Sequence, residues 1–144
     1  MIFQKMIEQR IDSDSTQSDI AKILGISQQA YSLWETGDKI IPLKHLNTLC
    51  NYYNVSMDYL VGLSNTKHYD VISKKLDRIK IGKRLKLFRE KHNIKQIKLA
   101  NLLNTSHSTI SAYEHGKTLI LTAFAYQIAK KFGVSMDWLC CRID

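Results

Sequence analysis

Two short stretches hold the side chains best suited to recognising another molecule, GISQQAYSLWETG at residues 25–37 and NTSHSTISAYEHG at residues 104–116. In each, a residue that tolerates left-handed backbone, Gly25 or Asn104, is followed two positions later by a serine that can cap a helix. The helix that follows carries glutamine, serine, threonine or histidine and few charges. Such side chains donate and accept hydrogen bonds, which is the chemistry that reads base edges in a DNA major groove.

The apolar residues of each stretch recur at spacings of three and four, so they predict which side of the helix faces inward. The polar side chains left on the outer side are Gln28, Gln29 and Ser32 in the first stretch and His107, Ser108, Thr109 and Ser111 in the second, with Ser27 and Ser106 as the capping serines.

Both stretches belong to a longer repeat. Shifting the sequence by 79 residues without gaps aligns QSDIAKILGISQQAYSLWETG (17–37) with QIKLANLLNTSHSTISAYEHG (96–116), and NVSMDYL (54–60) with GVSMDWL (133–139). Upstream, Arg10 coincides with Arg89 and Ile2 with Ile81. One domain of roughly 60 residues therefore occurs twice. We call residues 1–64 copy one and residues 79–144 copy two.

Each copy is predicted to contain five short helices and no strand. In copy one the helices cover residues 2–10, 17–24 and 28–35, a fourth helix that starts near Pro42, and MDYL at 57–60. The fold class is therefore all-α, with two tandem five-helix domains joined by a basic linker at residues 65–78. Ile72, Leu76 and Ile79 could extend one helix back through the linker, whereas Gly82 opposes this, so a helical and an irregular linker both stay open.

Charge is divided unevenly between the two parts of the chain, which has a net charge of +8. Residues 1–64 hold five Lys or Arg against seven Asp or Glu, giving −2, and residues 65–144 hold sixteen against six, giving +10. The densest segment, residues 74–98, has eleven basic residues in twenty-five. Such a field attracts a polyanion, and nucleic acid is the polyanion that the polar helices also suit.

Copy two, which reads IGKRLKLFREKHNIKQIKLANLLNTSHSTISAYEHGKT and later VSMDWL, resembles the Cro/C1-type (XRE) helix-turn-helix family of phage repressors and bacterial regulators. The resemblance covers about residues 2–62 and 81–140 and implies two lambda-repressor-like DNA-binding domains. It implies that Gln17 and Gln96 bind phosphate, that Gln28-Gln29 and His107-Ser108 read bases, and that Lys39 and Lys117 touch phosphate. It also implies the structural ion pairs Arg10–Glu35 and Arg89–Glu114.

The expected function is a sequence-specific regulator of transcription that binds double-stranded DNA, in particular a bacterial, phage or mobile-element repressor that occludes an operator. Its operator is expected to contain two half-sites, read by one chain or by a homodimer. Copy one departs from the family pattern, since Tyr31 stands where Val or Ile is usual. Asp38 also follows the glycine at a position where a basic residue is usual. Copy one is therefore either a second reader or a domain that dimerises or binds a protein partner. The alternative function is an interaction protein, such as an antitoxin or a counter-defence regulator, that still binds DNA through copy two.

Other classes of protein find little support. The five histidines include no His-Glu-x-x-His pair, no glycine-rich phosphate loop is present, and Cys50, Cys140 and Cys141 have no metal-binding spacing. No apolar run reaches the roughly 18–20 residues of a membrane span. We therefore expect no catalytic residue, metal, cofactor or membrane contact, and a location in the bacterial cytoplasm at the nucleoid.

Overall fold

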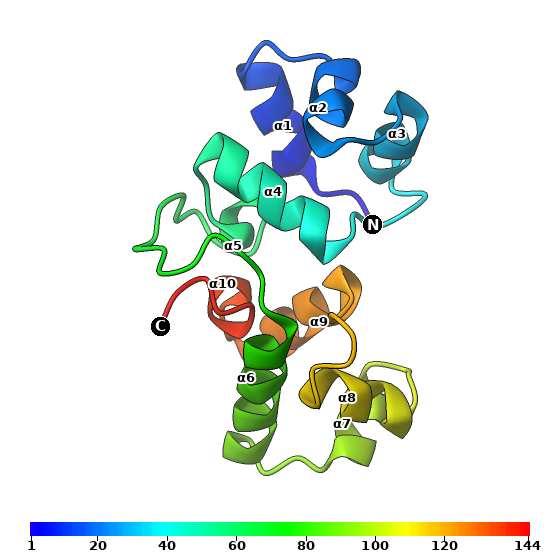
Figure 1. The fold of residues 1–144 in the computed structure, drawn as a ribbon, viewed down its shortest axis with the longest axis vertical. Coiled ribbons are helices and arrows are strands. Elements are labelled where there is room, and N and C mark those ends of the chain that lie inside the picture. Colours follow the sequence, from blue (N-terminus) through cyan, green and yellow to red (C-terminus); the bar gives the residue numbers. More distant parts are fainter. The chain divides into compact units, whose positions relative to one another are not determined.

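The computed structural model describes all residues from 1 to 144 and contains ten α-helices and no strand (Figure 1). The prediction of an all-α fold is confirmed. The chain divides into two compact units, unit 1 at Met1–Asp70 and unit 2 at Val71–Asp144. None of the helices combines the length and the apolar character that crossing a membrane requires.

Unit 1 is built from five helices, which are α1 (Gln4–Asp12), α2 (Gln17–Leu24), α3 (Gln28–Thr36), α4 (Leu43–Tyr53) and α5 (Met57–Leu60). Helix α3 packs against α2 and α1, while α5 packs against α1 and α4. Met6, Ile20, Tyr31 and Leu46 are fully buried where these helices meet. The first helix begins two residues later than predicted, because Phe3 is its extended N-cap.

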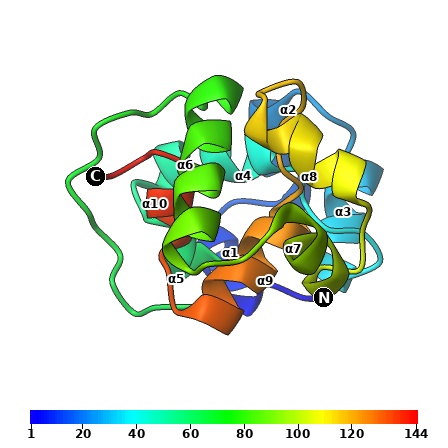
Figure 2. The ribbon, with the colours of Figure 1, turned by 90° about the horizontal axis from the view of Figure 1, so that it is seen from below.

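Unit 2 repeats this order with α6 (Arg78–Lys91), α7 (Gln96–Leu102), α8 (His107–Glu114), α9 (Thr122–Phe132) and α10 (Met136–Leu139). Helix α8 packs against α6 and α7, and α10 packs against α6 and α9. Figure 2 shows α7 and α8 on one side of α6 and the C-terminal residues on its other side. The long helix α6 is thus the scaffold on which α8 is held.

The turns between the second and third helices follow the sequence prediction in both units. Gly25 adopts a φ of 70° and Asn104 a φ of 56°, both in the left-handed region. Two residues later, the hydroxyl oxygens of Ser27 and Ser106 accept hydrogen bonds from the backbone N–H groups of Ala30 and Thr109, each at 3.1 Å. The turn therefore ends the preceding helix, and α3 and α8 begin as separate helices with capped N-termini.

Residues 65–77 are not helical and α6 begins at Arg78, so the alternative of a helical linker is wrong. Its first part is tied to unit 1, where the Ser56 hydroxyl donates to the carbonyl of Thr66 at 2.7 Å. Its second part is tied to unit 2, where the Ile72 N–H donates to the carbonyl of Arg142 at 2.8 Å. Asp77 then starts α6 by accepting hydrogen bonds from the N–H groups of Ile79 and Lys80. These contacts use the backbone groups that a continuous helix would need.

The repeat register does not hold upstream of the first helix. Ile2 lies against Gly37 and Ile79 lies against Gly116, so closely that a side chain at either glycine would clash. Gly37 and Gly116 are 79 positions apart, but Ile2 and Ile79 are not. Ile81, which the alignment pairs with Ile2, is buried in unit 2 instead. The reason is that α6 is already helical at residue 79, whereas the chain at residue 2 is not.

Candidate DNA-binding surfaces

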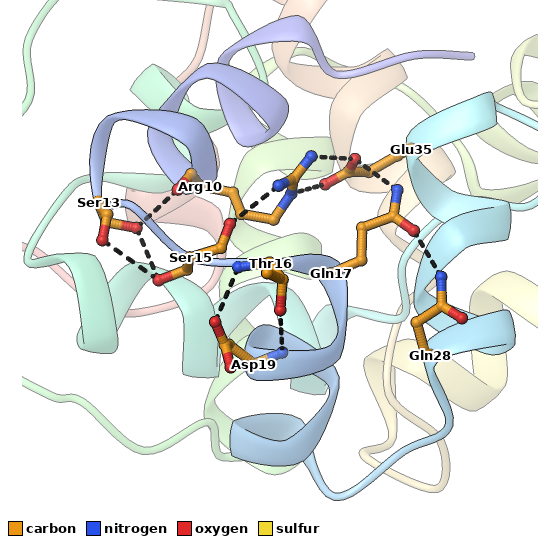
Figure 3. Close-up of polar contacts among 8 residues, drawn as sticks. All are labelled: Arg10, Ser13, Ser15, Thr16, Gln17, Asp19, Gln28 and Glu35. Atoms are coloured by element: carbon orange, nitrogen blue, oxygen red, sulfur yellow. Dashed lines mark hydrogen bonds and ion pairs between the residues drawn. The ribbon is translucent and has the colours of Figure 1, made fainter.

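In unit 1 a chain of hydrogen bonds runs from the inside of the unit to the exposed start of α3 (Figure 3). Arg10 forms a two-pronged ion pair with Glu35, at 2.7 Å from Nε and 3.0 Å from Nη2. The amide nitrogen of Gln17 donates to Glu35 Oε1 at 3.0 Å. The amide nitrogen of Gln28 then donates to Gln17 Oε1 at 2.9 Å. The chain links a residue expected to bind phosphate with a residue expected to read bases.

Unit 2 contains the same chain with one different member. Arg89 pairs with Glu114 at 2.7 Å and 3.0 Å, and the amide nitrogen of Gln96 donates to Glu114 Oε1 at 3.1 Å. Here the last member is His107, whose Nε2 lies 2.7 Å from Gln96 Oε1. Both ion pairs therefore join the helix-turn-helix to the first helix of their unit, and both hold a glutamine at the start of the second helix.

The difference between Gln28 and His107 determines what each side chain still offers to a base. Because Gln96 uses its amide nitrogen on a carboxylate, its oxygen must accept, and His107 Nε2 must donate. A neutral imidazole then has only an acceptor left at Nδ1. Gln28 donates to Gln17 through one N–H and keeps a second N–H and an oxygen. Gln28 can thus satisfy both the donor and the acceptor of adenine, whereas His107 can satisfy only a donor.

The carboxylate of Glu35, at the centre of the hydrogen-bonded series in unit 1, is held in its charged form. Burial alone opposes the charge, but hydrogen bonds from Arg10 and Gln17 outweigh it and keep the pKa of Glu35 below its ordinary value. The hydrogen bond to Glu35 raises the pKa of Arg10, so the pair is fully ionised at neutral pH.

The remaining predicted site residues fall into two groups. Gln29 and Ser108 are exposed on the first turn of α3 and α8, and Lys39 and Lys117 are exposed after those helices. Ser32 and Ser111 are only partly exposed, and the Ser111 hydroxyl lies 3.3 Å from His115 Nδ1.

The capping serines are less available to a ligand. Besides capping α8, the Ser106 hydroxyl contacts the hydroxyls of Ser108 at 3.0 Å and Thr109 at 2.8 Å. Ser27 and Ser106 are therefore occupied by the fold.

The structure also identifies two lysines that the sequence reasoning missed. In unit 1 the start of α2 has a capping box, in which Thr16 Oγ1 accepts from the Asp19 N–H and Asp19 Oδ2 accepts from the Thr16 N–H. These bonds also lower the pKa of Asp19. In unit 2 the same two positions are Lys95 and Lys98, and α7 has no side-chain cap. The alignment of the two copies at an offset of 79 residues could have identified these lysines, since both residues of the capping box are replaced by lysine in copy two.

Two lysines at a helix N-terminus are unfavourable for the helix, because that end carries partial positive charge. They are favourable for a bound phosphate, which the same N–H groups attract. Gln96 lies between Lys95 and Lys98, and both lysines are exposed. Lys95, Gln96 and Lys98 are thus candidate phosphate-binding residues at the start of α7, whereas Thr16 and Asp19 occupy the lysine positions in α2.

The net charges of the two units strengthen this contrast. Unit 1 holds six basic and eight acidic residues, giving −2, and unit 2 holds fifteen and five, giving +10. The loop after α3 differs in charge from the loop after α8, because Asp38 of unit 1 stands at the position of Lys117 in unit 2. Asp38 accepts a hydrogen bond from the Thr36 hydroxyl at 2.8 Å.

The geometry of both units agrees with the sequence comparisons. The helix-turn-helix family model matches residues 6–60 and again residues 85–139, which are offset by the same 79 positions as the repeat. The chain belongs to this family, and the prediction of two tandem XRE-type helix-turn-helix regions is confirmed. Several curated proteins that match this chain are named HTH-type transcriptional regulators.

Curated relatives include the HTH-type transcriptional regulator MJ0272 of Methanocaldococcus jannaschii, 43% identical over 38% of this chain and 82% of its own length. The regulator YqaE of Bacillus subtilis is 39% identical over 42% of this chain and 53% of its length. The antitoxin PezA of Streptococcus pneumoniae is 34% identical over 38% of this chain and 35% of its length. The chain thus spans only about a third of PezA and about half of YqaE. No solved structure matches it.

Proposed function

We propose that this protein is a sequence-specific repressor that binds an operator in double-stranded DNA and blocks transcription by occupying it. The observation that carries the proposal is the chain Arg89–Glu114–Gln96–His107, which fixes the residue at the exposed start of α8 to the residue at the start of α7. A duplex lying on these two helix starts would place its phosphates at Gln96, Lys95 and Lys98 and its base edges at His107 and Ser108.

Unit 2 is the principal DNA-binding unit in this proposal, with Thr109, Ser111 and Lys117 completing its contact surface. Its charge of +10 favours a polyanion, and its lysines replace the capping box that unit 1 keeps. Unit 1 would read a second half-site through Gln28 and Gln29, so that one chain covers two turns of major groove. A homodimer that uses unit 2 twice would cover the same length of DNA. As a DNA-binding regulator, the protein would act in the cytoplasm at the nucleoid and carry out no catalysis.

The experiment that tests the proposal is selection of bound duplexes from a random DNA pool, followed by binding measurements on matched variants of the full chain. His107→Ala with Ser108→Ala should relax the base preference of one half-site, at a cost of about 1–3 kcal/mol per base pair. Gln28→Ala with Gln29→Ala makes the same change at the equivalent positions of unit 1. If no consensus is selected, or if the unit 2 variant keeps the full preference, the proposal is wrong.

A second candidate function is supported by the charge of unit 1. A unit with a charge of −2 and a capping box at α2 repels phosphate, yet it keeps the folded helix-turn-helix surface. Unit 1 would then bind a protein partner or a second copy of the chain while unit 2 binds DNA, as in an antitoxin. The antitoxin PezA is similar to part of this chain. This candidate predicts that the unit 1 variant binds every selected duplex as tightly as the unaltered protein, and a second half-site that depends on Gln28 and Gln29 would contradict it.

A further inference from the structure

A cavity of about 410 Å³ lies beside α6, and every residue that lines it belongs to unit 2. Its size is within the range of about 300–1,000 Å³ that is usual for small-molecule sites. The lining contains four cations and one carboxylate, and its cationic residues are Lys75, Lys80, Lys83 and Arg84. Ile72 and Leu87, which are 57% and 43% exposed, add an apolar wall. We call this cavity the α6 cavity.

None of the four cations of the α6 cavity forms an ion pair with an acidic side chain. The ion pairs of α6 are formed by Lys86 with Glu90 and by Arg89 with Glu114, and neither uses a cavity lysine. Asp77 is the acid of the lining, and its Oδ1 already accepts hydrogen bonds from the N–H groups of Ile79 and Lys80, at 2.9 and 3.2 Å. Cations three and four residues apart on one helix repel each other. A bound anion would remove this repulsion.

Arg84 is held in place at the cavity by its own contacts. Its Nη1 donates to the carbonyl oxygens of Trp138 and Ile143 at 2.6 and 3.0 Å. Its guanidinium carbon lies 4.9 Å from the centre of the Trp138 ring. Both hydrogen bonds use Nη1, so the donors of Nε and Nη2 are left for a ligand. A guanidinium fixed in this way binds an oxyanion with little loss of side-chain entropy.

Neither the fold nor the proposed DNA contact requires these cations. At the positions of Lys83, Arg84 and Leu87, copy one has Gln4, Lys5 and Glu8, and it pairs Lys5 with Glu8 at 3.3 Å. The same fold therefore forms without a positive cavity.

The direction of the cavity also separates it from DNA. With about 100° of rotation per residue, Lys80, Lys83, Arg84 and Leu87 lie on nearly the opposite side of α6 from Gly82 and Arg89. Gly82 and Arg89 face α8, because a methyl group at Gly82 would meet the carbonyl oxygen of Tyr113 and Arg89 pairs with the carboxylate of Glu114. Figure 2 shows α8 on one side of α6 and the C-terminus of the chain on the other. Helix α6 thus stands between the DNA-reading helix and the cavity.

We propose that the α6 cavity binds a small organic polyphosphate, of the size and charge of a nucleoside triphosphate, independently of DNA. The three lysines and Arg84 would hold the phosphates, because a phosphate chain can accept a charge-assisted hydrogen bond from each of the four cations of the lining. Ile72 and Leu87 would cover the apolar part of the ligand, which inorganic phosphate lacks. This proposal does not depend on the proposed repressor function, since it concerns a different side of unit 2.

The test measures ATP binding to the full chain by calorimetry and, separately, the protection of Cys141 from alkylation. Cys141 lines the cavity and is partly exposed, whereas Cys50 and Cys140 are buried, so alkylation reports on this cavity. Burial raises the pKa of the Cys141 thiol, so the labelling is done at mildly alkaline pH. We expect ATP to slow alkylation with the same dissociation constant that calorimetry gives. Pyrophosphate should bind more weakly than ATP, and adenosine should not bind.

Matched lysine variants separate a specific site from general attraction to a basic protein. Lys80→Gln and Lys83→Gln should each weaken ATP binding about tenfold, because each removes a hydrogen bond to a charged group. Lys86→Gln removes an equal charge from the same helix outside the cavity and should leave binding unchanged. All three residues are exposed, and circular dichroism checks that the variants fold.

Four results would overturn the proposal. These are no binding of ATP, equal affinity for pyrophosphate and ATP, equal losses in the Lys86 and Lys83 variants, or protection of Cys141 by a DNA duplex as strong as that by ATP. If the unaltered protein selects no operator but binds ATP as expected, only the proposed repressor function is contradicted.

Discussion

Transferring the capping box of α2 to α7 should stabilise unit 2 and weaken its binding to DNA. The change is Lys95→Thr with Lys98→Asp, which gives α7 the residues that Thr16 and Asp19 provide in α2. The backbone is ready for it, since Lys95 has φ −76° and ψ 158° while Thr16 has φ −81° and ψ 165°. The new threonine oxygen would accept from the N–H of residue 98, as Thr16 Oγ1 accepts from the Asp19 N–H at 3.0 Å.

The expected gain in stability has two parts. A side-chain N-cap contributes about 0.5–2 kcal/mol, and replacing a cation by an anion in the first turn adds about 0.3–1 kcal/mol. The free energy of unfolding of unit 2 should therefore rise by about 1–3 kcal/mol. Urea unfolding followed by the emission of Trp138 measures it. A Trp34→Phe background removes the signal of unit 1, because the chain has two tryptophans and one lies in each unit.

The expected loss in DNA binding is a matter of counterions. If Lys95 and Lys98 each neutralise one phosphate, removing both should reduce the slope of log affinity against log salt by about 1.8. The loss should be similar for operator and unrelated duplexes, since phosphate contacts carry no base information. Greater stability with an unchanged salt slope would refute the assignment of these lysines to phosphate. If stability does not increase, the inference that Lys95 and Lys98 destabilise the N-terminus of α7 is wrong.

Further predictions concern the base-reading residue His107, the ion pair of Glu35 and the contact of Gly82 with α8. His107→Gln should raise the preference for adenine at one base pair by about 1–3 kcal/mol, because an amide keeps a second N–H for the base, whereas the single N–H of a neutral histidine is used by Gln96. Competition among four duplexes at pH 8 measures the preference, and an unchanged preference contradicts the hydrogen-bond order. Because the pKa of Glu35 lies below its ordinary 4.5, its contribution to stability is present above that pH and is lost as the pH falls through the lower folded-state value. Glu35→Gln should cost unit 1 about 3 kcal/mol at neutral pH and flatten this acid dependence in unfolding followed by Trp34 emission; an unaltered pH profile would assign the loss to another group. Gly82→Ala should destabilise unit 2 by about 1–3 kcal/mol although alanine is the better helix former, because its methyl group would meet the carbonyl oxygens of Tyr113 and Glu114; a more stable variant in urea unfolding would show that α6 and α8 are not so close.

The sequence alone determined the features that depend on neighbouring residues. The left-handed turns at Gly25 and Asn104 and the caps at Ser27 and Ser106 were predictable, because a residue's backbone preference and a bond to the third residue along are local effects. The duplicated all-α fold was predictable for a similar reason. Apolar spacing of three and four identifies helices, and a constant offset of 79 identifies the repeat.

Tertiary structure decided what joins residues that are far apart in the chain. The hydrogen bond between Gln96 and His107 depends on where two helices cross, and so does the choice of the Gln96 amide nitrogen as donor to Glu114. The irregular linker depends on the carbonyl of Arg142, which Ile72 reaches only after the unit has folded. The alignment pairs Ile81 with Ile2, yet Ile79 is the residue that lies against Gly116, and this depends on where α6 begins. Local pattern sets the conformation of a segment, whereas the partners of its side chains are set by packing against distant segments, which no local pattern contains.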